Sequence, residues 1–152
     1  LRCLVGSEMC IRDRYTPARM EILSQKPLVL LDGGHNPGCA SALHEVLKTH
    51  LSGRHITAIM GMMADKDSMR YLELTAPHFE RIITVQPQNP RSLSAEALAD
   101  EAKHFCKDVQ PAQSMKDAIE KATVSGDEVL VICGSFFLAS EIRDLAIEKY
   151  KA

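Results

Sequence analysis

The alternation of short apolar runs with longer stretches of helical periodicity is the feature that most constrains this fold. The apolar runs span residues 28–31, 55–60, 81–85 and 128–133, with a very short further strand near residue 109. The helical stretches span about residues 37–51, 66–77, 94–105, 114–124 and 136–150. Short, continuously apolar runs are typical of buried parallel strands, and helices between them cover both faces of the sheet. The pattern therefore predicts an α/β, Rossmann-like domain with a mainly parallel sheet.

Size, charge and cysteine usage exclude several classes of partner. The 152 residues fit a single domain. With 18 basic and 20 acidic side chains the net charge is −2, which argues against nucleic acid. No apolar run approaches the roughly 20 residues that cross a bilayer, so we expect no membrane association. The five cysteines form no CxxC pair, which argues against a disulfide framework or zinc site and fits the cytoplasm. We expect a cytoplasmic monomer.

The first segment, residues 1–14, fits none of this pattern. It has no strong helical or strand period and lacks the long apolar core of a signal peptide. The stretch resembles a translated sequencing adapter, in which case Leu1 is a false start. A natural N-terminus is the alternative. We expect residues 1–14 to be a non-native segment and exclude it from the fold.

Polar residues follow directly after the predicted strands. These clusters occupy residues 32–37, 61–67, 88–91 and 134–135. Ligands of open parallel α/β sheets bind beyond the carboxyl ends of the strands. We therefore expect the four clusters to gather on one edge of the sheet and to form a common site.

Two residues of the first cluster have two interpretations each. Asp32 can accept both hydroxyls of a ribose, as acidic residues at strand ends do in dinucleotide-binding folds. It can equally cap the turn into the next helix. His35 is either a turn residue or a group that exchanges a hydrogen bond or proton with a ligand.

Lys66 and Ser135 are similarly ambiguous. Lys66 can neutralise a phosphate or carboxylate, or lie in solvent at a helix start. Ser135 stands at a strand-to-helix junction, where it can bind an anion or cap the helix. The chain contains no GxxxxGK[ST] loop and no evident Mg²⁺ site. A protein that cleaves ATP needs both, so the chain by itself looks like half of an active site.

Five motifs in order resemble the C-terminal domain of folylpolyglutamate synthases and bifunctional dihydrofolate synthases, which are ligases of the Mur superfamily. The motifs are an arginine at Arg19, D-G-G-H-N-P at residues 32–37, G-M-M-A-D-K-D at 61–67, N-P-R-S-L at 89–93 and C-G-S at 133–135. The resemblance covers about residues 15–150. Gly34 replaces the usual alanine and Met63 the usual leucine, and neither change removes a functional group.

The resemblance implies an enzyme that uses ATP and Mg²⁺ to activate a carboxylate as an acyl phosphate, which the amine of L-glutamate then attacks. Arg19, Asp32 and His35 would bind ATP, and Lys66 and Ser135 would bind glutamate. His35 and Lys66 are possible catalytic residues, and this domain would hold no metal ligand.

The resemblance also implies how the chain is divided. Residues 15–26 would link an absent ATP-binding central domain, which carries the phosphate loop and the Mg²⁺ ligands, to a Mur ligase C-terminal-type domain at 27–152. The chain alone would then be inactive. Two alternatives are another Mur-type amino-acid ligase and a stand-alone, non-catalytic nucleotide-binding module. The sequence does not distinguish addition of the first glutamate to dihydropteroate from extension of a folate tail.

Overall fold

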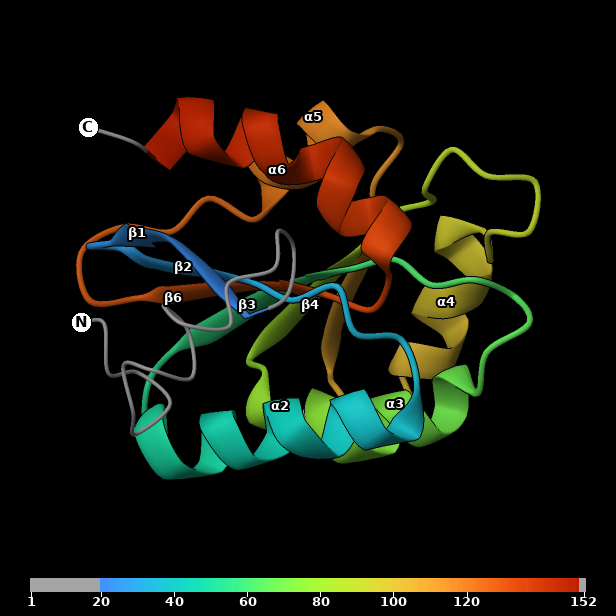
Figure 1. Ribbon diagram of the computed structural model, residues 1–152, viewed down its shortest axis with the longest axis horizontal. Coiled ribbons are helices and arrows are strands. Elements are labelled where there is room, and N and C mark those ends of the chain that lie inside the picture. The colour runs from blue at the N-terminus through green and yellow to red at the C-terminus, as the bar shows by residue number, and fades with distance from the viewer. Residues whose placement is uncertain (1–19, 151–152) are drawn as a thin grey trace.

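The computed structural model describes residues 20–150, which form a six-stranded sheet between two layers of helices (Figure 1). The strands are β1 (Glu21–Gln25), β2 (Leu28–Leu31), β3 (Ile56–Met60), β4 (Arg81–Thr84), β5 (Asp108–Pro111) and β6 (Val129–Cys133). The helices are α2 (Pro37–His50), α3 (Ser68–Thr75), the 3₁₀ turn η1 (Ala76–His78), α4 (Ala95–Ala102), α5 (Met115–Lys121) and α6 (Phe136–Tyr150). Their order confirms the predicted α/β architecture.

The sheet has the order β1-β2-β6-β3-β4-β5. Every neighbouring pair from β2 to β5 is parallel, and β6, the last strand in the sequence, inserts between β2 and β3. Only β1 is antiparallel, to β2. Strand β1 was not predicted from the sequence, because Glu21–Gln25 mixes polar and apolar residues within the segment expected to be a linker.

The two faces of the sheet carry separate halves of the core. On one face, Leu30 and Val131 pack in a cluster with buried residues of α2, α3 and α4. On the other face, Leu31 and Ile132 pack with buried residues of α5 and α6. Figure 1 shows these helices on opposite sides of the sheet. Alternate side chains of fully buried strands thus supply both layers, which explains their continuous apolar sequence.

Side-chain caps set the helix starts. Asn36, Ser94 and Ser114 each accept a hydrogen bond from the backbone amide three residues further on, as does Asp67 before α3. These caps agree with the helical stretches predicted from about residues 37 and 94. The helix predicted from residue 66 begins instead at Ser68, because Asp67 is its cap.

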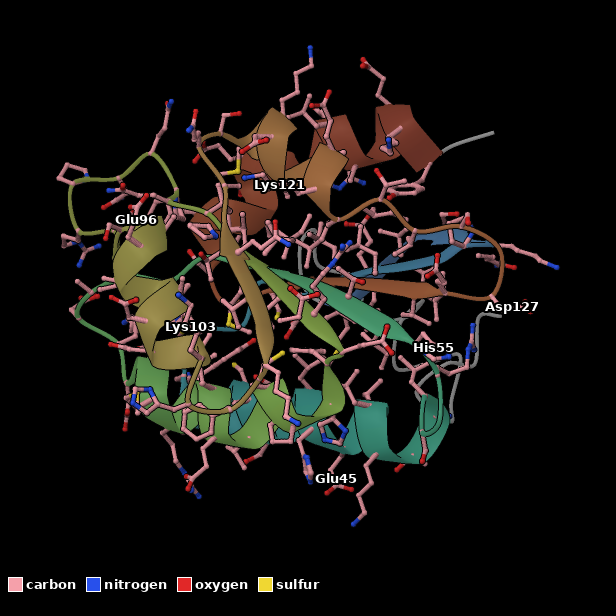
Figure 2. The ribbon with its side chains drawn as sticks, turned by 180° about the vertical axis from the view of Figure 1, so that it is seen from behind. Glu45, His55, Glu96, Lys103, Lys121 and Asp127 are labelled. Carbon is pink, nitrogen blue, oxygen red and sulfur yellow. The ribbon has the colours of Figure 1, made fainter. Side chains whose placement is uncertain are left out.

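The amino ends of the strands carry exposed polar contacts. Figure 2 shows His55 and Asp127 close together at this end, before β3 and β6. Arg54 donates to the Asp127 carbonyl oxygen at 2.7 Å, and His55 pairs with Glu80 at 2.8 Å. Within residues 20–150, no helix is long and apolar enough to span a membrane.

Candidate functional site

The segments that follow β2, β6 and β3 meet at the carboxyl edge of the sheet. The Asp32 amide donates to the Ile132 carbonyl at 2.8 Å, and the Gly61 amide approaches the Cys133 carbonyl at 3.4 Å. Gly134 has a φ of +113°, and a Cβ atom there would lie 2.7 Å from the Gly61 carbonyl oxygen. Only glycine fits this conformation and this close approach. The strand ends therefore bring the predicted clusters together.

Asp32 is buried at the end of β2, with only 2% of its surface exposed. Its Oδ1 atom lies 3.4 Å from the amide nitrogen of Gly34, a long contact within the turn. This contact is the one expected of a turn residue, and it does not test the ribose interpretation.

His35 directly follows the glycine pair and is half-buried. Its Nδ1 atom is buried and has no hydrogen-bond partner among the described residues. An unsatisfied buried nitrogen costs free energy, so a bound ligand that hydrogen-bonds to it would relieve that cost. This geometry is compatible with the ligand-binding interpretation of His35 and leaves it a prediction.

A pocket of about 330 Å³ opens on this edge of the sheet. Its lining consists of His35, Met63, Lys66, Arg91, Ser135, Phe136 and Phe137. Three of the predicted site residues, contributed by three different strand-end segments, thus face one cavity. Asp32 is not part of this lining, and Arg19 lies outside the described residues.

Ser135 caps the last helix and also faces the pocket. Its Oγ accepts hydrogen bonds from the amides of Phe137, at 3.0 Å, and Leu138, at 3.4 Å. The capping interpretation is therefore confirmed. A hydroxyl that accepts from the helix still has its own proton to donate, so capping and anion binding are compatible here. The exposed rings of Phe136 and Phe137 form one wall of the pocket.

Arg91 is the charged pocket residue that was not singled out from sequence, although it belongs to the predicted cluster at residues 88–91. Its guanidinium pairs with Asp65 at 3.1 Å, and Lys66 follows directly in the chain. The sequence indicated only that Arg91 lies in the N-P-R cluster after β4. It did not indicate whether the Arg91 side chain faces the site, because this depends on how the loops after β3 and β4 pair.

The floor beneath the site is buried and uncharged. Burial raises the pKa of the Cys133 thiol to about 12, and burial also raises the pKa of the Tyr71 hydroxyl beside it well above its usual value. Cys133 is thus a neutral thiol and no nucleophile at neutral pH. In the described part of the chain, no three His, Cys, Asp or Glu side chains converge as a metal site.

Sequence relatives of the chain are folate-pathway ligases. The dihydrofolate synthase/folylpolyglutamate synthase of Mycobacterium tuberculosis is 33% identical over 147 residues, which cover 86% of this chain and 30% of that protein. The folylpolyglutamate synthase of Lacticaseibacillus casei is 34% identical over 135 residues, covering 85% of this chain and 29% of that protein. The chain therefore spans about a third of the length of these relatives.

Solved structures give the same result. The M. tuberculosis folylpolyglutamate synthase complexed with ADP superposes with a TM-score of 0.79 at 31% identity, over 86% of this chain and 32% of that one. The Thermotoga maritima folylpolyglutamate synthase superposes with a TM-score of 0.76 at 32% identity, over 95% of this chain and 35% of that one. The matched part corresponds to the C-terminal domain of such enzymes.

The family described as "Mur ligase, glutamate ligase domain" matches residues 18–136. That range includes the strand-end segments of β2, β3, β4 and β6 and every described pocket residue except Phe137. The chain therefore belongs to the Mur ligase family, as a glutamate ligase domain.

Proposed function

We propose that this chain is the C-terminal domain of an ATP-dependent ligase that adds L-glutamate to dihydropteroate, to (poly)glutamyl folate, or to both, through an acyl phosphate. The observation that carries the proposal is the pocket that joins His35, Lys66 and Ser135 at the carboxyl edge of a sheet with this family's fold. A pocket with basic and hydroxyl side chains suits a carboxylate ligand.

ATP would bind on the β2 side of this edge. Asp32 would accept the ribose hydroxyls, His35 would supply a polar contact, and Arg19 would approach the phosphates. The buried, unsatisfied Nδ1 atom of His35 supports a ligand at this place. ATP would supply the phosphoryl group that activates the substrate carboxylate. Mg²⁺ would be held by the preceding domain, which also carries the phosphate loop.

L-Glutamate would bind in the pocket through Lys66 and Ser135. The ammonium of Lys66 would neutralise one carboxylate, and the Ser135 hydroxyl would donate a hydrogen bond to a carboxylate oxygen. These contacts would orient the amine of glutamate towards the acyl phosphate. Among the described residues, His35 and Lys66 are the candidates for a catalytic role, because both face the cavity.

Catalysis would require this domain to close on a preceding one, with residues 15–26 as the connection. Residues 21–25 of that segment are strand β1 of this sheet, so any hinge motion would take place before Glu21. We place the enzyme in the cytoplasm as a monomer whose partners are small molecules.

The test is an assay of the complete reading frame that contains this chain. Purified protein should form an amide between L-glutamate and dihydropteroate or a folate, with ATP converted to ADP and phosphate in equal amounts. An upstream GxxxxGK[ST] loop in the same frame is the matching sequence observation. A complete protein that shows neither glutamate-dependent nor folate-dependent ATP cleavage would contradict the proposal.

A further inference from the structure

His44 and His78 face each other across the contact between α2 and η1. The Nδ1 atom of His44 lies 2.8 Å from the Nε2 atom of His78, and the ring centroids are 4.9 Å apart. The two residues are 34 positions apart in the sequence, so the tertiary fold brings them together. Figure 1 shows α2 and α3 in the same helical layer, and η1 follows α3 directly. Neither histidine lines the pocket at the carboxyl edge of the sheet.

The two ring nitrogens are directed at one point between them. Burial, and secondly the neighbouring His44, lower the pKa of His78 below its usual 6.5, so His78 is neutral near neutral pH. A neutral imidazole has one nitrogen with a free lone pair, and this is the form that binds a metal ion. In the hydrogen bond between the rings, the N–H of one points at the lone pair of the other.

The distance between these nitrogens is close to that between two histidine ligands of one metal ion. Zinc–nitrogen bonds of about 2.0–2.1 Å that meet at about 90–109° place the two nitrogens roughly 2.9–3.4 Å apart. The present 2.8 Å is slightly shorter, and a small rotation of either side chain supplies the difference. Both histidines are only partly buried, so water can reach the point between them.

The surrounding charges neither attract nor repel a cation strongly. Glu45 and Lys48 are the charged residues of α2 nearest to His44 in the sequence. They are of opposite sign, and both are exposed. Within residues 20–150, no cluster of three His, Cys, Asp or Glu side chains is placed to hold a metal ion. The two imidazoles are therefore the protein ligands that the described residues offer here.

We propose that His44 and His78 bind one divalent transition-metal ion of the zinc class, through Nδ1 and Nε2 respectively, with water completing the coordination. Imidazole nitrogen is a preferred ligand of zinc, nickel and copper ions. On binding, the proton between the rings moves to the outer nitrogen of the ring that carries it, so that both inner nitrogens present a lone pair. The ion would link α2 to the segment after α3. This site lies apart from the pocket and does not depend on the proposed ligase function.

The experiment titrates Zn²⁺ into the chain near neutral pH and follows the histidine ring signals by NMR. Cys3→Ser and Cys10→Ser form the background, because thiolates outside the described residues would compete for the ion. The ring signals of His44 and His78 should shift together and saturate at one ion per chain. At a free Zn²⁺ concentration ten times the Kd, the Tm should rise by about 3–6 °C.

His44→Gln and His78→Gln each remove one ligand and keep a polar side chain. Each should weaken Zn²⁺ binding about tenfold or more, at least the loss that follows removal of a partner outside the coordination sphere. The matched control is His104→Gln, at an exposed histidine that contacts the Glu101 carbonyl oxygen. This control should leave the affinity and the rise in Tm unchanged.

Two outcomes would overturn the proposal. If the ring signals of His44 and His78 do not move while Zn²⁺ is added, the pair is a hydrogen bond and nothing more. If both single variants bind Zn²⁺ as tightly as the background chain, the ion lies at another group. The ring signals are read with both histidines in place, so the test holds even where a variant does not fold.

Discussion

Gly34 shows how a single residue of a recognisable motif is fitted to its own neighbours. A Cβ atom at this position would lie 2.4 Å from the Cβ of Cys39 and 2.9 Å from its Sγ. The first turn of α2 thus occupies the space that the methyl group of the more usual alanine would need. The sequence alone did not reveal this constraint, because Cys39, the residue that requires a glycine here, lies five positions further along the chain.

Gly34→Ala should therefore destabilise the protein, by roughly 1–3 kcal/mol, which is typical of overpacking a tight site. The measurement is the free energy of unfolding in urea. Cys39→Gly removes both crowding atoms, so the pair of substitutions should cost less than the sum of the two single ones. Strict additivity would show that Cys39 does not crowd position 34.

The two interpretations of Asp32, as a ribose ligand or as a turn residue, can be separated by measuring nucleotide binding. In the complete enzyme, Asp32→Ala should raise the KM for ATP about tenfold or more, as expected for loss of a charged hydrogen-bond acceptor. The KM for glutamate should change less, because Asp32 is not part of the pocket lining. An unchanged KM for ATP would make Asp32 a turn residue only.

The residues that sequence could identify are those whose position after a strand is itself informative. Asp32 and Ser135 lie one and two residues after the ends of β2 and β6, and parallel strands bring such positions to one edge. Lys66 lies six residues beyond the end of β3, and its candidacy came from the G-M-M-A-D-K-D motif instead. Arg91 lies seven residues beyond the end of β4. Its approach to the pocket depends on hydrogen bonds between two loops, which no periodicity reveals.

At the scale of elements, β1 is held to the last helix by a partly buried ion pair. The Nε and Nη2 atoms of Arg143 on α6 donate to the two carboxylate oxygens of Glu21, at 3.0 and 2.5 Å. Glu21 is 7% exposed. The pair joins residues 122 positions apart. The strand β1 could not be recognised from its polar sequence, because the residue that pairs with Glu21 lies near the other end of the chain.

Arg143→Met should cost about 3 kcal/mol of stability, because it removes the charge that offsets burial of the Glu21 carboxylate. Unfolding in urea measures this loss. Glu21→Gln combined with Arg143→Met should recover part of it, since the uncompensated charge is then gone. If the double variant is as unstable as Arg143→Met, the loss does not come from an uncompensated charge on Glu21. The attraction between the two side chains would then be what holds β1.

A second link between elements joins α2 to η1 and is sensitive to pH. The Nδ1 atom of His44 and the Nε2 atom of His78 lie 2.8 Å apart. Burial, and secondly the neighbouring His44, lower the pKa of His78 below its usual 6.5. The folded state therefore binds a proton less readily than the unfolded state.

It follows that this pair stabilises the fold above pH of about 6.5 and that the contribution is lost as the pH falls through the lowered pKa. The Tm should decrease between pH 7 and pH 5, about the range over which histidine titrates. His78→Gln should flatten this dependence, while His55→Gln, at an exposed histidine, should not. Equal slopes for the unaltered chain and His78→Gln would contradict the assignment.

At the scale of the molecule, the fold was predictable because its strands are buried on both faces and its helices have clear caps. The order of the strands was not, since insertion of β6 between β2 and β3 depends on packing across the whole chain. That insertion has a consequence for function. It places the C-G-S segment next to the D-G-G-H-N-P segment, so residues a hundred positions apart share one pocket.

The same arrangement predicts what this chain does alone. Its described residues supply a pocket at the carboxyl edge of the sheet, but no motif of the sequence supplies a phosphate-binding loop. The purified chain should therefore show no glutamate-dependent ATP hydrolysis, and it should bind ATP much more weakly than the complete enzyme. Phosphate release with L-glutamate and a folate present measures the first, and calorimetry the second. Because electrostatic stabilisation of the transferring phosphoryl group provides most of the rate in such reactions, measurable turnover by this chain would show that the domain contains a phosphate site of its own.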